Sequence, residues 1–79
     1  MTNYAWKISS SERVYAENVG PLSALETCLH VLDLPMDRPP SEIISFMKLM
    51  QLEGQAVYKY RSQKDARSQW TLVWIELPQ

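Results

Sequence analysis

The chain has 79 residues, of which 46% are hydrophobic and 22% charged, and a net charge of −1; this is typical of one globular domain and too short for two hydrophobic cores. One cysteine, Cys28, and one histidine, His30, exclude an intramolecular disulfide and a tetrahedral zinc site, and favour a reducing cytoplasm. No apolar run approaches the ~20 residues that cross a bilayer, so we expect neither export nor membrane insertion.

Two strands are expected first. Residues 4–8 alternate, with Tyr4, Trp6 and Ile8 on one face, which is the period of a half-buried strand. Residues 9–12 form a polar turn, and residues 13–19 resume an extended pattern. The sequence therefore predicts a β-hairpin.

Two helices are expected next. Pro21 is suited to the first turn of a helix, and a leucine stripe follows at spacings of three and four. The segment LPMDRPP (34–40) could be read as a proline-rich ligand for an aromatic groove, but prolines are also expected where one helix ends and another begins, and we favour a linker. Ser41 is a suitable N-cap and Gly54 a suitable stop for a second helix over 41–53.

Two strands close the chain, over residues 55–61 and 69–77, joined by the polar loop 62–68. The order ββααββ predicts a single α+β domain spanning residues 1–79. We expect a four-stranded antiparallel sheet with two helices on one face.

Catalytic groups are sparse. His30 has Glu26 and Asp33 at helical spacing, a possible start for a general base, but no nucleophile or second catalytic group accompanies it, and we favour an exposed histidine with charged neighbours. Cys28 and His30 point about 200° apart on a helix and cannot form a thiolate pair. Two glycines leave no phosphate-binding loop. We expect no enzyme, no catalytic residue and no cofactor, metal or small-molecule substrate.

A basic, aromatic stretch covers residues 58–70, YKYRSQKDARSQW. Its four basic residues give residues 54–70 a net charge of +3, whereas residues 1–53 carry −3. A basic hairpin with aromatics at its base could bind nucleic acid, but four charges are few and the pI is about 5.7. We favour electrostatic steering toward an acidic protein surface, with nucleic acid as the alternative. The residues concerned are Lys59, Arg61, Lys64 and Arg67.

More apolar surface is present than one small core needs. Residues 69–77 are apolar on both faces, and the second helix has apolar residues on more than one side. Large exposed apolar patches usually mark protein contacts, and aromatic residues dominate such contacts. The alternative is that the core curls around the last strand. The partner-binding surface is predicted to comprise Trp70, Leu72, Trp74, Ile44, Leu49 and Leu52.

The favoured hypothesis is a small cytoplasmic, non-enzymatic protein-binding module that acts as an adaptor, regulator or inhibitor of a larger protein, or as a homodimer. Domains of this kind are common among accessory proteins of bacteria and phages, an association that by itself defines no function. No stretch of the sequence matches a motif of known chemistry.

Overall fold

The computed structural model describes residues 2–62 and 69–78. Its elements follow the predicted order ββααββ: β1 Tyr4–Ser9, β2 Val14–Gly20, α1 Leu22–Leu32, α2 Pro40–Met50, β3 Gln55–Tyr60 and β4 Trp70–Glu76. The four strands form one antiparallel sheet in the order β2-β1-β4-β3. The predicted α+β fold is confirmed.

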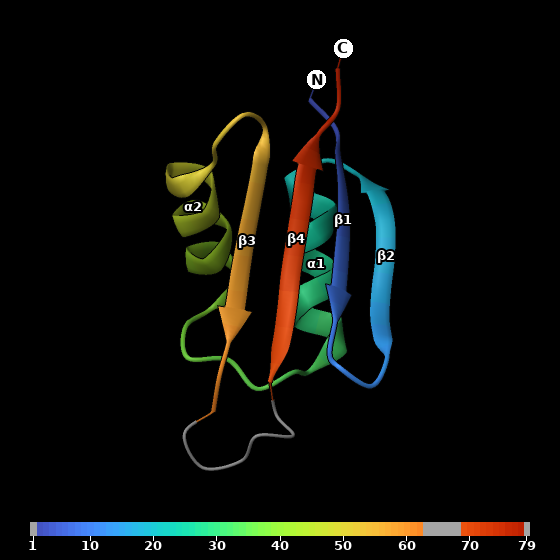
Figure 1. Cartoon of the computed structure of the whole chain (residues 1–79), viewed down its shortest axis with the longest axis vertical. Helices are drawn as coiled ribbons and strands as arrows, with labels where there is room; N and C mark the ends of the chain where they lie inside the picture. The colour runs from blue at the N-terminus through green and yellow to red at the C-terminus, as the bar shows by residue number, and fades with distance from the viewer. Residues whose placement is uncertain (1, 63–68, 79) are drawn as a thin grey trace.

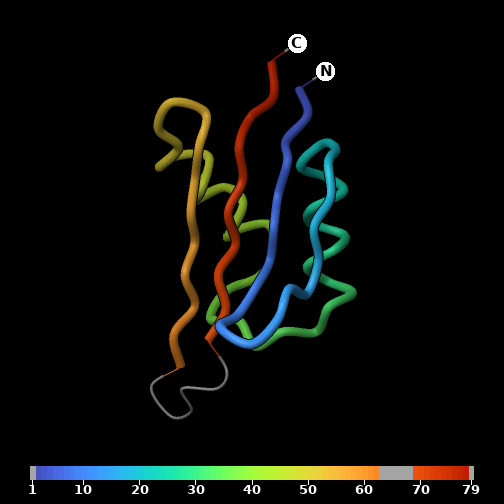
Figure 2. Tube along the Cα trace, turned by 45° about the vertical axis from the view of Figure 1, so that its right-hand side comes forward, coloured from blue at the N-terminus to red at the C-terminus, as the bar shows by residue number. Residues whose placement is uncertain are grey.

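Both helices lie on the same side of the sheet, as Figures 1 and 2 show from two directions. The first and last strands, β1 and β4, are neighbours in the middle of the sheet. The backbone N–H of Leu77 donates to the carbonyl of Asn3 at 2.9 Å, which extends this central pairing beyond the strands. The chain therefore begins and ends at the same end of the sheet (Figure 1).

The core fills the space between the sheet and the helices. Alternate strand residues point to opposite faces of a sheet, so β1, β3 and β4 contribute every second side chain to this layer, whereas β2 contributes only the partly buried Tyr15 and Ala16. The helices contribute residues three and four apart. Its buried members are Tyr4, Trp6, Ile8, Leu25, Leu29, Ile43, Ile44, Met47, Ala56, Tyr58, Trp70, Leu72 and Trp74.

The second helix differs from its prediction at both ends. It begins at Pro40 with Pro39 as the N-cap, so Ser41 lies inside the helix and does not cap it. It ends at Met50 because the chain turns sharply at Glu53 and Gly54, where φ is 52° and 79°. Leu52 and Gln55 exchange two backbone hydrogen bonds across this turn. Positive φ at both central positions is the pattern of a two-residue hairpin turn, so Gly54 serves the entry to β3 rather than the end of α2.

Candidate functional site

The tryptophan face of β4 is part of the core, contrary to the predicted partner surface. Trp70, Leu72 and Trp74 are only 2%, 0% and 2% exposed. The indole N–H of Trp70 donates to the Pro35 carbonyl at 2.7 Å, and that of Trp74 donates to Oε1 of Gln51 at 3.0 Å. The helices and the linker between them cover this face, so the three residues offer almost no surface to a partner.

The predicted partner-binding residues on and after α2 differ in their exposure to solvent. Ile44 is buried beside Ile43 and Met47, because residues 40, 43, 44 and 47 form the stripe that packs on the sheet. Leu49 and Leu52 are 82% and 75% exposed, as the prediction requires. Ile44 is therefore a core residue, and only Leu49 and Leu52 of the predicted surface reach solvent.

The uncovered side of the sheet carries the surface that the sequence analysis missed. We call it the open face and define it by Ala5, Lys7, Glu17, Val19, Gln55, Val57, Val73 and Ile75. The strand register sets these residues in two rows across the sheet. One row runs Val19, Ala5, Ile75, Gln55, and the next runs Glu17, Lys7, Val73, Val57.

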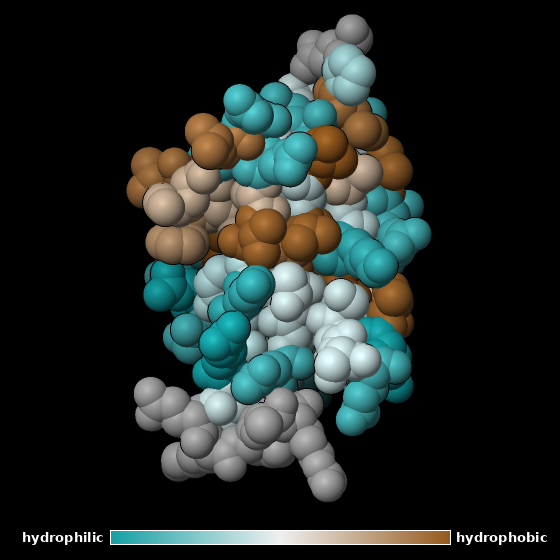
Figure 3. All heavy atoms as spheres, viewed as in Figure 1, coloured by the Kyte–Doolittle hydropathy of each residue, from teal (hydrophilic) through white to brown (hydrophobic). Residues whose placement is uncertain are grey.

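The open face is apolar in its middle. Val73 and Ile75 are 36% and 43% exposed, and Val19 and Val57 on the two outer strands are more exposed still. Figure 3 shows apolar side chains in the centre of this face and at both of its sides. No element among the described residues 2–62 and 69–78 covers it (Figure 1).

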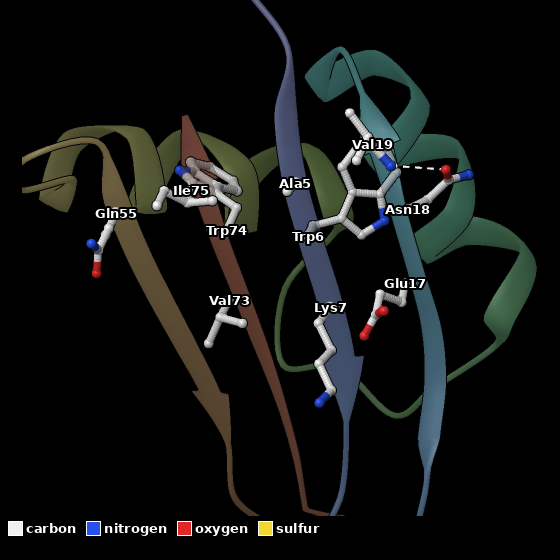
Figure 4. Close-up of a pocket in the computed structure, with 10 residues that line it drawn as sticks. All are labelled: Ala5, Trp6, Lys7, Glu17, Asn18, Val19, Gln55, Val73, Trp74 and Ile75. Carbon is white, nitrogen blue, oxygen red and sulfur yellow. Dashed lines mark hydrogen bonds between the residues drawn. The ribbon is translucent and has the colours of Figure 1, made fainter. Parts of the chain in front are cut away.

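A shallow hollow of about 550 Å³ lies in this face. Ala5 lies in the middle of its row, between Val19 on β2 and Ile75 on β4 (Figure 4). The face is hollow at this point because the Ala5 side chain is only a methyl group. Lys7 and Glu17, which are direct cross-strand neighbours, border it on one side. The hollow thus has apolar walls and a mixed-charge border.

The other end of the sheet, where Lys59 and Thr71 continue the open side, is polar and basic. A second hollow, of about 210 Å³, is lined by Lys59, Arg61 and the aromatic pair Tyr60 and Trp70, whose rings stack at a centroid distance of 5.9 Å. Ser10, Ser11, Gln69 and Thr71 complete the lining. We call this the basic end. Two of the four predicted steering residues are therefore brought to one place, whereas Lys64 and Arg67 lie outside the described residues.

An apolar ridge runs along the outer side of α2. Phe46, Leu49, Met50 and Leu52 are exposed there. Phe46 is anchored at the α2–β3 junction, where its ring meets Tyr58 edge-on at 6.4 Å and the Arg38 guanidinium lies over it at 5.4 Å. The ridge gives the β3 side of the molecule further apolar surface.

Cys28 and His30, the two residues considered for catalysis, both lie on α1. Burial raises the pKa of the Cys28 thiol, which disfavours the thiolate. His30 is exposed on α1. No group of three His, Cys, Asp or Glu residues within 2–62 and 69–78 is arranged to hold a metal ion. In that same part of the chain, no helix is long and apolar enough to cross a membrane.

Two polar contacts fix the helix layer to the sheet. The Tyr58 hydroxyl donates to Asp37 in the linker before α2. At the opposite end of the sheet, Lys48 Nζ donates to the Tyr4 hydroxyl at 3.0 Å, which in turn donates to Glu76 at 3.2 Å. The bond to Tyr4 is the main cause that raises the pKa of Lys48. These contacts hold α2 in place and leave the open face uncovered.

We predict that Tyr58 ionises late and that stability falls as it does. Its pKa is raised to about 12, mainly because burial disfavours the phenolate and further because its hydroxyl donates to Asp37. Since this exceeds the ordinary value of about 10, the stabilising contribution of Tyr58 is complete below pH 10 and is lost as the pH rises through about 12. Phenolate absorbance and circular dichroism over that range measure both events. Tyr58→Phe should remove the latest absorbance step; an unchanged profile would contradict the assignment.

Comparison with protein-family models, curated proteins and solved structures yields no match for this chain.

Proposed function

We propose that this protein is a non-enzymatic protein-binding module that acts through its open face as an adaptor, regulator or inhibitor of a larger protein in the cytoplasm. The observation that supports the proposal is a group of four exposed aliphatic side chains, Val19, Val57, Val73 and Ile75, on an uncovered sheet face, three of which line its hollow. Sheets with an apolar face are normally covered by another layer. A single cysteine and the absence of a disulfide favour the cytoplasm.

The magnitude of the apolar effect indicates what kind of binding to expect. Full burial of a valine or isoleucine contributes about 1.5–3 kcal/mol, so covering these four half-exposed side chains yields roughly 1 kcal/mol each. Association costs about 4–15 kcal/mol in lost freedom. Burial of these four aliphatic side chains alone therefore does not hold a partner. The α2 ridge or the basic end must add to it, which favours an extended contact with a protein over capture of a small molecule.

Site-specific photo-crosslinking tests the proposal. We expect a photoreactive residue at position 73 to crosslink a protein partner in extract of the source cells, and one at position 31 to give none. Val31 is the matched control because it is 76% exposed and lies on α1, in the helix layer. Val73→Thr keeps the β-branched shape and removes apolar surface, so it should weaken capture about tenfold or less. Equal crosslinking at the two positions, or none at position 73, would rule out the open face.

The alternative function is nucleic-acid binding by the basic end together with Lys64 and Arg67. The hollow that joins Lys59 and Arg61 to hydroxyl groups is the observation that favours it. If all four basic residues met phosphates, log K would fall against log salt with a slope of about −3.6. We expect instead no binding of labelled single- or double-stranded oligonucleotides above background. Micromolar binding with that slope, lost in Lys59→Glu/Arg61→Glu, would favour the alternative.

A further inference from the structure

We propose that the occupant of the open face is an amphipathic helix of a partner protein, with apolar residues in its first turns and acidic residues in its last two. The helix would lie along the strands, its apolar part over the hollow around Ala5 and its acidic C-terminal end over Lys59 and Arg61. This inference rests on the proposed function and adds the chemistry and direction of the partner.

The geometry of the face favours a helix over a strand. An extended peptide binds by adding to a free sheet edge, where its backbone hydrogen bonds are formed. The open face is centred on β1 and β4, the two inner strands, which have paired neighbours on both sides and offer only side chains there. β4 has seven residues, or about 23 Å of strand, which matches a helix of about 15 residues at 1.5 Å per residue.

The charges along the face define a direction. Near the hollow, Lys7 and Glu17 are cross-strand neighbours and offset one another. At the basic end, Lys59 and Arg61 have no acidic residue among the described residues that line the hollow with them. An acidic group is therefore attracted to one end of the face only.

Hydrogen-bond donors at the basic end suit the C-terminal end of a bound helix. The Ser10 oxygen already accepts from the backbone N–H groups of Glu12 and Arg13, which leaves its hydroxyl hydrogen as a donor. The last carbonyls of a helix lack partners inside the helix and carry its negative dipole end. A C-terminus over the basic end thus receives both cations and donors, whereas an N-terminus there would present its own unpaired N–H groups.

The distance between the two parts defines the spacing in the partner. Ile75 beside the hollow and Thr71 at the basic end are four residues apart on β4, about 13 Å. A helix covers this distance in about nine residues. The acidic residues should therefore follow the first apolar contact by about two to three turns.

A second copy of this chain is a poor match for the same surface. α2 has its apolar ridge, but its acidic residue Glu42 is in the first turn and its last turn carries Lys48. α1 has Glu26 and its C-cap Asp33 near its end, but its leucines Leu25 and Leu29 are buried in the core of its own chain. α2 thus places a basic group where an acidic one is required, and the leucine stripe of α1 is already occupied.

The experiment uses three labelled 16-residue peptides of designed amphipathic sequence. The first has leucines on one face and three glutamates in its last two turns, the second has its glutamates in the first two turns, and the third has lysines in place of the glutamates. We expect the first to bind about tenfold more tightly than the other two, as two exposed ion pairs of ordinary strength provide. The preference should shrink with salt, since charges here are screened over about 8 Å at physiological ionic strength.

Variants assign the binding to the face. Lys59→Glu/Arg61→Glu should reverse the preference between the first and third peptides, Val73→Thr should weaken all three, and Val31→Thr should change none. Equal binding of the peptides, or no binding, overturns the inference. Sedimentation of the wild type as a dimer that Val73→Thr dissociates also overturns it, because the second copy is then the occupant. Crosslinking at position 73 with no charge preference would leave the proposed function standing and reject the acidic helix alone.

Discussion

Replacement of Trp74 by alanine is expected to lower the free energy of unfolding by about 3–5 kcal/mol, the usual cost of truncating a buried tryptophan. Trp74 is 2% exposed, meets Tyr4 edge-on at a centroid distance of 5.4 Å, and donates to Gln51. It therefore ties the middle of the sheet to the end of α2. A 79-residue chain has a total stability of only about 4–12 kcal/mol, so the variant should be largely unfolded or close to it.

Urea unfolding followed by circular dichroism measures this effect. Trp74→Phe should recover part of the loss, because it keeps most of the ring packing and loses the hydrogen bond. Leu49→Ala is the matched control from the same predicted partner surface, and its 82% exposure implies a change within about 0.5 kcal/mol. A Trp74→Ala variant as stable as the wild type would show that the tryptophan face of β4 is not in the core.

The element order was predictable because strong local signals mark every boundary. The alternation around Trp6 identifies β1, and Pro21, Pro39 and Pro40 stand at the starts of the helices. Prolines restrict their own backbone and that of the preceding residue, so they act without tertiary contacts. The end of α2 was placed too late because it depends on a turn through Glu53 and Gly54 that a glycine alone does not distinguish from a helix stop.

The orientation of β4 was not predictable from β4 itself. Both of its faces are apolar, so alternation does not say which one is covered. The register resolves it: Trp74 lies opposite Trp6, and Val73 lies opposite Lys7. Lys7 on β1 identifies the open side of the sheet, and the pairing of β4 with β1 therefore determines which face of β4 is covered. That pairing joins residues almost a whole chain length apart, and no local signal in the sequence specifies it.

The candidate site was therefore half predicted. An excess of apolar surface was expected and is present. The prediction placed it at the large aromatic residues Trp70 and Trp74, whereas smaller side chains such as Val73 and Ile75 form it. Large rings fill the layer between sheet and helices, and β-branched residues suit the pleated outer surface. On α2, Ile44 belongs to the core stripe because residues at i and i+4 from Pro40 share its face.

Replacement of Ile43 by aspartate is expected to abolish cooperative folding. Ile43 has no solvent exposure and no buried polar residue beside it, since every buried residue of the described part of the chain is hydrophobic. The change removes an aliphatic side chain from the core, at about 2–5 kcal/mol, and adds a carboxylate without a partner, at several kcal/mol more. The sum matches or exceeds the whole stability of a chain this size.

Ser45→Asp is the control, because Ser45 is exposed two residues away on the same helix and receives the same charge. Circular dichroism and urea titration should show a native spectrum with a single transition for Ser45→Asp and neither for Ile43→Asp. Two variants of equal stability would mean that α2 does not pack on the sheet through Ile43. The assignment of one side of the sheet as covered by helices and the other as open would then be wrong.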